Sequence, residues 1–256
     1  MKLLKNVTAP TQKLIRTVAA VVLVYILMEI LIAAGCISSL IQGLLVPVCT
    51  YSIAAVALNL CVGYLGELSL GHAGFMCLGA FASAYFSKLT ADTIPDVPRF
   101  ILALIIGTAV AALFGFLIAI PVLRLKGDYL AIVTLAFGEI IKNVMNVIYV
   151  GKDSVGLHFS MKDQLSLGMS VDGKMIINGA QGITGTPRQS TFTVGVVLLI
   201  LALIITSNFV NSRTGRAVKA IRDNRIAAET VGLPVSKYKL IAFTLSAAIA
   251  GVAGVL

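Results

Sequence analysis

The sequence predicts an all-α integral membrane protein, a polytopic transmembrane helix bundle with about seven spans that forms a single domain over residues 1–256. Hydrophobic residues make up 58% of the chain and charged residues only 12%, whereas soluble domains carry about 25% charged residues. The apolar residues occur in long blocks, as transmembrane helices require. Basic residues beside these blocks supply the net charge of +9, and orientation in a membrane explains them better than nucleic-acid binding does. We therefore expect contacts with membrane lipid and none with nucleic acid.

Seven apolar blocks have the length of a membrane span, which is about 20 residues. They cover residues 17–35, 40–62, 68–89, 100–122, 129–150, 192–210 and 237–256. The last block reaches Leu256 without a polar flank, so we expect the native chain to continue beyond this residue.

Small residues recur with four-residue spacing inside two of the blocks. In lipid, helices associate through packing, and small residues let two helices approach closely. The spacing therefore predicts a compact bundle. The rows are Gly107, Ala111 and Gly115, then Ala247 and Gly251, with Ala250 and Gly254 beside the second row.

The distribution of basic residues predicts a cytoplasmic N-terminus in a multi-pass protein. If each block crosses once from that start, thirteen Lys and Arg residues fall in cytoplasmic segments and six in external ones. Cytoplasmic loops carry the excess of such residues. In this orientation residues 151–191 form a long polar external loop and residues 212–236 a cytoplasmic segment. The external loop is either a docking surface or a passive connector, and both remain open at this point.

Glycines and polar residues crowd the entrance to the third block, between residues 63 and 75. Each glycine weakens a helix by about 1 kcal/mol relative to alanine, so a broken or re-entrant segment is expected. Irregular backbone at membrane depth survives only where protein or a water-filled cavity satisfies it. The segment is either a wall or gate of a translocation path or a site of close helix packing with a turn. The residues concerned are Gly66, Glu67, Ser69, Gly71, His72 and Gly74.

The fifth block carries polar residues at positions i, i+3, i+4 and i+7, which places them on one helical face. Glu139 and Lys142 can pair, which reduces the cost of about 3 kcal/mol for a lone charge at mid-bilayer. Such a face lines a path or clasps neighbouring helices, and the residues alone do not decide between the two. The other members of the face are Asn143 and Asn146.

The cytoplasmic segment 212–236 predicts one amphipathic helix of about 16 residues, with Ser212 or Thr214 at its start and Gly232 and Pro234 at its end. Val218, Ile221, Ala228 and Val231 supply its apolar face, and basic residues surround them. The helix either docks a partner protein or lies on anionic lipid.

No nucleotide-binding or catalytic motif accompanies these features. The chain has no GxxxxGK[ST], HExxH or GxSxG sequence and no paired cysteines. We therefore expect no enzyme activity, no catalytic residues, no metal and no cofactor. The alternatives from the residues alone are an ion-coupled secondary transporter of a small solute that uses Glu139, Lys142 or His72, a membrane-embedded enzyme, and a membrane scaffold without transport.

Three stretches resemble the inner-membrane permease subunits of branched-chain amino-acid importers of the ATP-binding-cassette (ABC) class, the LivM type. They are residues 66–75, residues 124–135 with 138–141, and residues 212–232. A shorter stretch of resemblance lies at residues 178–185. The resemblance covers most of the chain from about residue 50 onward, and the three stretches in this order are specific.

The resemblance implies a transport subunit of a bacterial cell membrane that carries leucine, isoleucine or valine. Its implied partners are a second permease subunit, two cytoplasmic ABC ATPase subunits and an external solute-binding protein. A cytoplasmic loop with an EAA-type signature couples such permeases to the ATPase, although here Glu229 follows the alanines instead of leading them. The external loop is also longer than the family leads us to expect. The implied coupling residues are Arg213, Gly215, Arg216, Ala220, Ile221, Arg222, Ala227, Ala228, Glu229 and Gly232.

Overall fold

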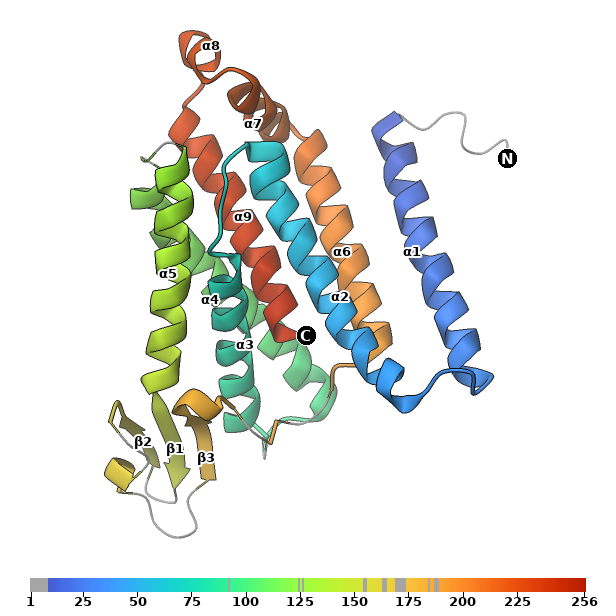
Figure 1. Cartoon of the computed structure of the whole chain (residues 1–256), viewed down its shortest axis with the longest axis vertical. Coiled ribbons are helices and arrows are strands. Elements are labelled where there is room, and N and C mark those ends of the chain that lie inside the picture. Colours follow the sequence, from blue (N-terminus) through green and yellow to red (C-terminus); the bar gives the residue numbers. More distant parts are fainter. Residues whose placement is uncertain are drawn as a thin grey trace.

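The protein is described from a computed structural model that covers residues 9–91, 93–123, 125, 127–153, 156–162, 165–168, 174–183, 185–186 and 189–256. Its long helices form a bundle with a small β-sheet at one end and two short helices at the other (Figure 1). The short helices are α7 (Arg213–Asp223) and α8 (Arg225–Thr230), and their side of the bundle is called the α7 end. The long helices are α1 (Ala9–Ala33), α2 (Ser39–Asn59), α3 (His72–Leu89), α4 (Asp96–Val122), α5 (Asp128–Val147), α6 (Phe192–Asn211) and α9 (Val235–Val255).

Within the described residues, six helices are long and apolar enough to cross a membrane, which confirms the predicted polytopic helical membrane protein. The third predicted span, residues 68–89, is not among them. Its helix α3 has only 18 residues, with His72 at one end and Lys88 near the other. An extended stretch, residues 66–71, descends from the α7 end to α3, so the stretch and the helix cross the bundle together (Figure 1).

Helix α9 lies at the centre of the bundle, where it packs against α2, α3 and α4. Phe243 of α9 and Ile53 of α2 are fully buried there. The predicted rows of small residues form this contact, because a Cβ added at Gly115 would clash with Ala247. A Cβ at Gly251 would clash with the side chain of Ala111. The close packing predicted from the four-residue spacing is therefore confirmed.

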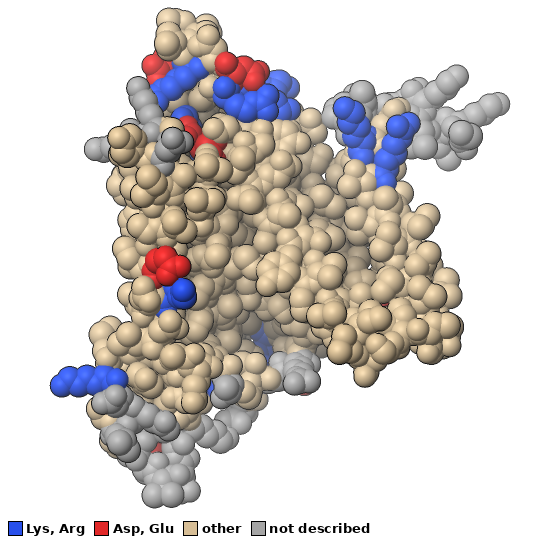
Figure 2. All heavy atoms as spheres, viewed as in Figure 1, with Lys and Arg blue, Asp and Glu red and all other residues tan. Residues whose placement is uncertain are grey.

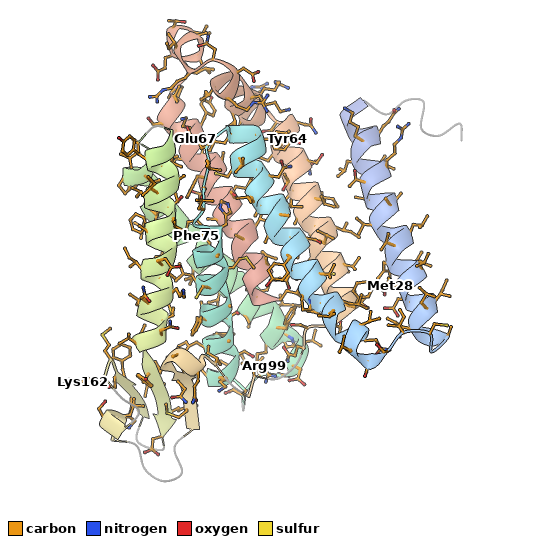
Figure 3. All side chains as sticks on the ribbon, viewed as in Figure 1. Met28, Tyr64, Glu67, Phe75, Arg99 and Lys162 are labelled. Atoms are coloured by element: carbon orange, nitrogen blue, oxygen red, sulfur yellow. The ribbon has the colours of Figure 1, made fainter. Side chains whose placement is uncertain are left out.

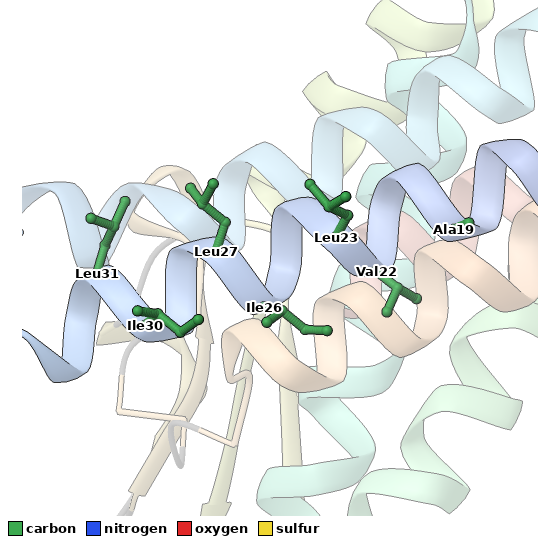
Figure 4. A pocket seen from close by; sticks show the side chains of 7 residues that line it. All are labelled: Ala19, Val22, Leu23, Ile26, Leu27, Ile30 and Leu31. Atoms are coloured by element: carbon green, nitrogen blue, oxygen red, sulfur yellow. The ribbon is translucent and has the colours of Figure 1, made fainter.

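Helix α1 stands at the edge of the bundle and contacts α6. Its Tyr25 packs on Phe192 with ring centroids 5.4 Å apart, and the Tyr25 hydroxyl hydrogen-bonds Thr193 at 3.1 Å. A shallow apolar groove runs along the outer side of α1 (Figure 4). An apolar face of this length suits contact with acyl chains. The groove is lined by Ala19, Val22, Leu23, Ile26, Leu27, Ile30 and Leu31.

The segment predicted to be a long polar external loop contains an antiparallel sheet in the order β2-β1-β3. The strands are β1 (Tyr149–Asp153), β2 (Gly156–Ser160) and β3 (Lys174–Asn178), with 3-10 turns at Leu165–Leu167 and Gly179–Gln181. The helical bundle is as predicted, and this segment adds a small sheet to it. The fifth predicted span also ends early, at Val147, because the chain becomes extended at Ile148 and enters β1.

A small apolar cluster attaches the sheet to the C-terminal half of α3. Val150, Ile176 and Ile177 are buried, and Phe81 and Tyr85 of α3 pack against them. The Lys88 ammonium donates hydrogen bonds to the carbonyls of Met175 at 3.1 Å and Ile176 at 3.4 Å. The segment between α5 and α6 is thus fixed on the bundle along α3.

Candidate functional site

The helix that begins as α2 is interrupted at the α7 end of the bundle. After Asn59 the chain makes a π-helical turn, Leu60–Leu65, and then enters the extended stretch that ends at His72. Gly66 turns the chain with φ +77°, a conformation that strains any residue with a side chain. Gly71 lies so close to the Thr134 carbonyl of α5 that a Cβ would clash with it. The predicted interruption is therefore present, and residues 60–71 are called the broken segment below.

His72 closes the broken segment inside the bundle, where the residue is 7% exposed. Its Nδ1 lies 3.1 Å from the Ser69 hydroxyl and its Nε2 lies 2.7 Å from the Ser246 hydroxyl of α9. The Ser246 hydroxyl donates its proton to the Ala57 carbonyl of α2. In the neutral imidazole the proton therefore sits on Nε2, and the Ser69 hydroxyl donates to Nδ1. This satisfied network joins α2, α3 and α9, so within this subunit His72 acts as a clasp between helices.

Glu67 and Lys239 form an ion pair between the broken segment and the first turn of α9. Their side chains are only 14% and 8% exposed. Both groups lie at the α7 end of the bundle, where Glu67 is seen beneath α7 (Figure 3). Removing one partner of such a pair leaves an uncompensated buried charge, which is strongly destabilising.

The polar face of α5 points away from the rest of the subunit. The Glu139 and Lys142 side chains pair at 3.3 Å, yet they remain 56% and 63% exposed. Asn143 and Asn146 are exposed beside them. Glu139 and Lys142 both lie inside α5, away from its ends, and Figure 2 shows few charged groups on the bundle between its two ends. Lipid tails offer no partner to these groups, so the face requires water or another protein chain.

The opposite face of α5 packs on the start of α3. A Cβ added at Gly74 would lie 3.0 Å from the Gly138 Cα of α5. The Thr134 hydroxyl accepts a hydrogen bond of 3.0 Å from the Leu70 N–H and donates to the Ala131 carbonyl at 2.9 Å. Of the predicted path residues, Gly71 and Gly74 therefore hold α5 against the broken segment and α3. The chain exposes Glu139, Lys142 and Asn143 on the other side.

The segment after α6 forms two helices, where the sequence predicted one. Asn224 is extended, with φ −154° and ψ 105°, and its side chain accepts a hydrogen bond from the Ala227 N–H at 3.0 Å. An asparagine that caps a new helix in this way ends the previous one. The predicted start is confirmed, because the Ser212 hydroxyl accepts from the Gly215 N–H at 3.1 Å.

The residues predicted for coupling fall into two groups in α7, α8 and the turn that follows. One group attaches the helices to the bundle: Gly215, Ile221 and Ala228 are buried. The other group is exposed, although Arg222 also bonds to the Gly63 carbonyl and Glu229 pairs with Arg225. Val231 was predicted on the apolar face, but it is 81% exposed, and Ile226 is 75% exposed. The exposed group is Arg213, Arg216, Ala220, Arg222, Ala227, Glu229 and Gly232.

Sequence reasoning missed several residues that hold these elements together. Thr134, Ser246 and Lys239 are buried, and each bonds to the broken segment or its flanks. Lys239 and Thr134 gave no local signal, because their partners are far away in the chain. Asn224 did give one, since asparagine before a short helical sequence is a common N-cap.

The fold is thus that of a multi-span helical membrane protein. One of its helices is interrupted, and two short surface helices lie between two of its spans. The chain belongs to the family described as the permease component of branched-chain amino acid transport systems, whose pattern matches residues 40–256. It is 34% identical over 221 residues to the LivM permease proteins of the high-affinity branched-chain amino acid transport systems of Salmonella typhimurium strain LT2 and Escherichia coli strain K12. These matches cover 80% of this chain and 49% of each relative.

A more distant relative is the nucleoside ABC transporter permease protein NupB of Lactococcus lactis, which is 24% identical over 201 residues, 75% of this chain and 51% of that protein. The chain spans about half the length of these curated relatives. No solved structure matches the chain.

Proposed function

We propose that this chain is a permease subunit of an ABC importer for branched-chain amino acids and that its α7–α8 region couples it to the ATPase. The observation that carries the proposal is the α7–α8 surface. Buried residues fix one side of it to the bundle, and the other side presents cations together with exposed Ile226 and Val231. A surface that joins two spans and offers both charge and apolar side chains suits docking of a protein. The names of the relatives support this class over an ion-coupled carrier.

The α7 end is the cytoplasmic end in this proposal. Most of the Lys and Arg residues in view gather at that end, over α7, α8 and the start of α1 (Figure 2). Cytoplasmic segments carry such an excess. Helix α1 begins at the same end (Figure 1), so the N-terminus is cytoplasmic and the β-sheet is external. The chain then lies in a bacterial cell membrane, with two ATPase subunits beneath α7 and α8.

The external sheet is the docking surface for a solute-binding protein in this proposal. Its edge strand β2 and the residue after it expose Leu157, Phe159 and Met161, which are 53%, 60% and 58% exposed. Alternate residues of a strand share one face, so these side chains form a row. Aromatic residues and methionine are enriched at the cores of protein interfaces.

The polar face of α5 is the wall of the path in this proposal and faces a second permease subunit, identical or homologous. Lipid cannot satisfy the exposed Glu139, Lys142 and Asn143, whereas a water-filled path between two subunits can. The amide and charged groups of this face would interact with the zwitterionic backbone of an amino acid as it crosses the membrane.

Water access to α5 can be measured by thiol labelling in a chain whose native cysteines are replaced by alanine. Asn143→Cys is expected to react with a membrane-impermeant maleimide, because its side chain would face the path. Val144→Cys is the matched control: Val144 is also exposed, but one position along a helix turns its side chain by about 100°. Equal protection of both thiols in the assembled complex would contradict the proposed path.

Co-purification tests the proposed class. After gentle solubilisation, the tagged chain is expected to retain an ABC ATPase whose hydrolysis rises when a leucine-loaded solute-binding protein is added. Retention of the ATPase without any response to a loaded binding protein would contradict the role as an importer subunit. Leucine uptake driven by an ion gradient in the absence of any ATPase would favour the secondary carrier instead.

A further inference from the structure

Arg222 directs its guanidinium from α7 into the broken segment. Its Nη1 donates a hydrogen bond of 2.8 Å to the Gly63 carbonyl. Gly63 lies in the last turn of the π-helix, and carbonyls in the last turn of a helix lack intrahelical donors. A cation there also meets the negative end of the helix dipole. The remaining guanidinium bonds go to Asp223, from Nε at 3.1 Å and from Nη2 at 2.9 Å.

The hydrophobic stem of Arg222 packs on the turn at Gly66. A Cβ added at Gly66 would lie 2.6 Å from the Arg222 Cγ and 3.5 Å from its Cβ. On the neighbouring turn of α7, the Lys219 ammonium lies 5.7 Å from the centre of the Tyr64 ring. Helix α7 thus holds the broken segment by one hydrogen bond, one tight contact and one cation–π contact.

The broken segment is held in turn by the helices that cross the membrane. Glu67 pairs with Lys239 at the start of α9. The Leu70 N–H bonds to Thr134 of α5 at 3.0 Å. The broken segment therefore lies between α7 on one side and α5, with its polar outer face, on the other.

We infer that Arg222 is the positioning residue that joins α7 to the broken segment, so that a displacement of α7 moves residues 60–71 and, through Thr134, α5. The inference rests on the proposed function, because it requires an ATPase that displaces α7. Residues 66–71 have contacts on both sides, with Arg222 of α7 and with Thr134 of α5 and Lys239 of α9, so a displacement on one side is passed to the other. The contact at Gly66 leaves no space for α7 to approach further without pushing the segment.

The first test compares leucine uptake per ATP hydrolysed in proteoliposomes that contain the full complex. Arg222→Ala is expected to lower this ratio by roughly 2- to 30-fold, the range that corresponds to coupling energies of about 0.5–2 kcal/mol. Lys237→Ala is the charge-matched control, because Lys237 is exposed at the same end of the bundle and has no described contact with the broken segment. Equal ratios in the two variants would overturn the inference.

A disulfide provides a second test, in which the same variant is compared in its reduced and its oxidised form. The Cβ separation of 3.5 Å between positions 66 and 222 falls at the short edge of the disulfide range of about 3.5–4.5 Å. In a chain without native cysteines, Gly66→Cys/Arg222→Cys is expected to be uncoupled when reduced and to regain uptake per ATP when oxidised. Each single cysteine variant controls for the oxidant. If the oxidised double variant does not recover uptake per ATP, the inferred link between α7 and the broken segment is overturned. If the unmodified complex shows no ATP-driven uptake, the proposed function is overturned and the link with it.

Discussion

Replacing Ala220 by proline in the middle of α7 is expected to abolish most ATP-driven leucine uptake by the assembled complex. Proline in a helix interior removes a hydrogen bond, clashes with the carbonyl four residues earlier and costs about 3 kcal/mol or more. The affected carbonyl belongs to Arg216, and α7 has only 11 residues. A helix of this length has few other backbone hydrogen bonds to offset the loss, so α7 would lose its rigid connection between the docking surface and the bundle. Because none of the spans changes, the chain should still insert.

Uptake of radiolabelled leucine measures this effect, with the amount of assembled complex determined by gel filtration. Ala220→Gly serves as the graded comparison, since glycine costs only about 1 kcal/mol relative to alanine in a helix. We expect its uptake to fall between that of the unmodified chain and that of Ala220→Pro. Unchanged uptake in an assembled Ala220→Pro complex would show that α7 does not transmit force.

Replacing Lys239 by methionine is expected to produce the largest loss of stability among the substitutions considered. It leaves the Glu67 carboxylate buried without its partner, and breaking a buried pair in this way costs about 3–5 kcal/mol. The double variant Glu67→Gln/Lys239→Met removes both charges and should recover much of the loss, because no uncompensated charge remains. Thermal unfolding of the purified protein in detergent measures both.

Lys237→Met is the matched control for this pair. Lys237 is exposed and lies two positions from the buried Lys239 in the same helix. Exposed surface charges contribute little to stability, so its unfolding temperature should stay close to that of the unmodified protein. Equal destabilisation by the two lysine substitutions would mean that the pair with Glu67 does not stabilise the broken segment.

The membrane-crossing helices were predictable because a bilayer imposes a length and a composition that can be read from one segment at a time. The interruption before α3 was predictable for a similar reason, since Gly63, Gly66 and Gly71 weaken a helix locally. The close packing of α4 on α9 followed from the spacing of Gly107, Ala111 and Gly115.

The contacts that organise the site were not predictable, because they join distant parts of the chain. His72 and Ser246 are 174 positions apart, Glu67 and Lys239 are 172 apart, and Arg222 and Gly63 are 159 apart. A single sequence contains no signal for such pairs. The sheet was missed because its strands are only five residues long, too short for alternation to stand out beside a span.

The residues predicted to form a gate have different contacts in the folded chain. His72 and Ser69 belong to a buried clasp, whereas Glu67 belongs to a buried ion pair. Glu139 and Lys142 remain on the outer face of α5. Both segments were predicted to line or gate the path. We instead propose that the broken segment transmits movement and that α5 presents the polar wall.

Transport by the complete complex in proteoliposomes tests the central claim most directly. With ATP supplied to the α7 side and a leucine-loaded solute-binding protein supplied to the sheet side, the account predicts leucine uptake that requires both. Removal of either component, or delivery of both to the opposite sides, should reduce uptake to the level of empty vesicles. Leucine uptake by this chain alone, driven by a proton or sodium gradient and indifferent to ATP, would contradict the account.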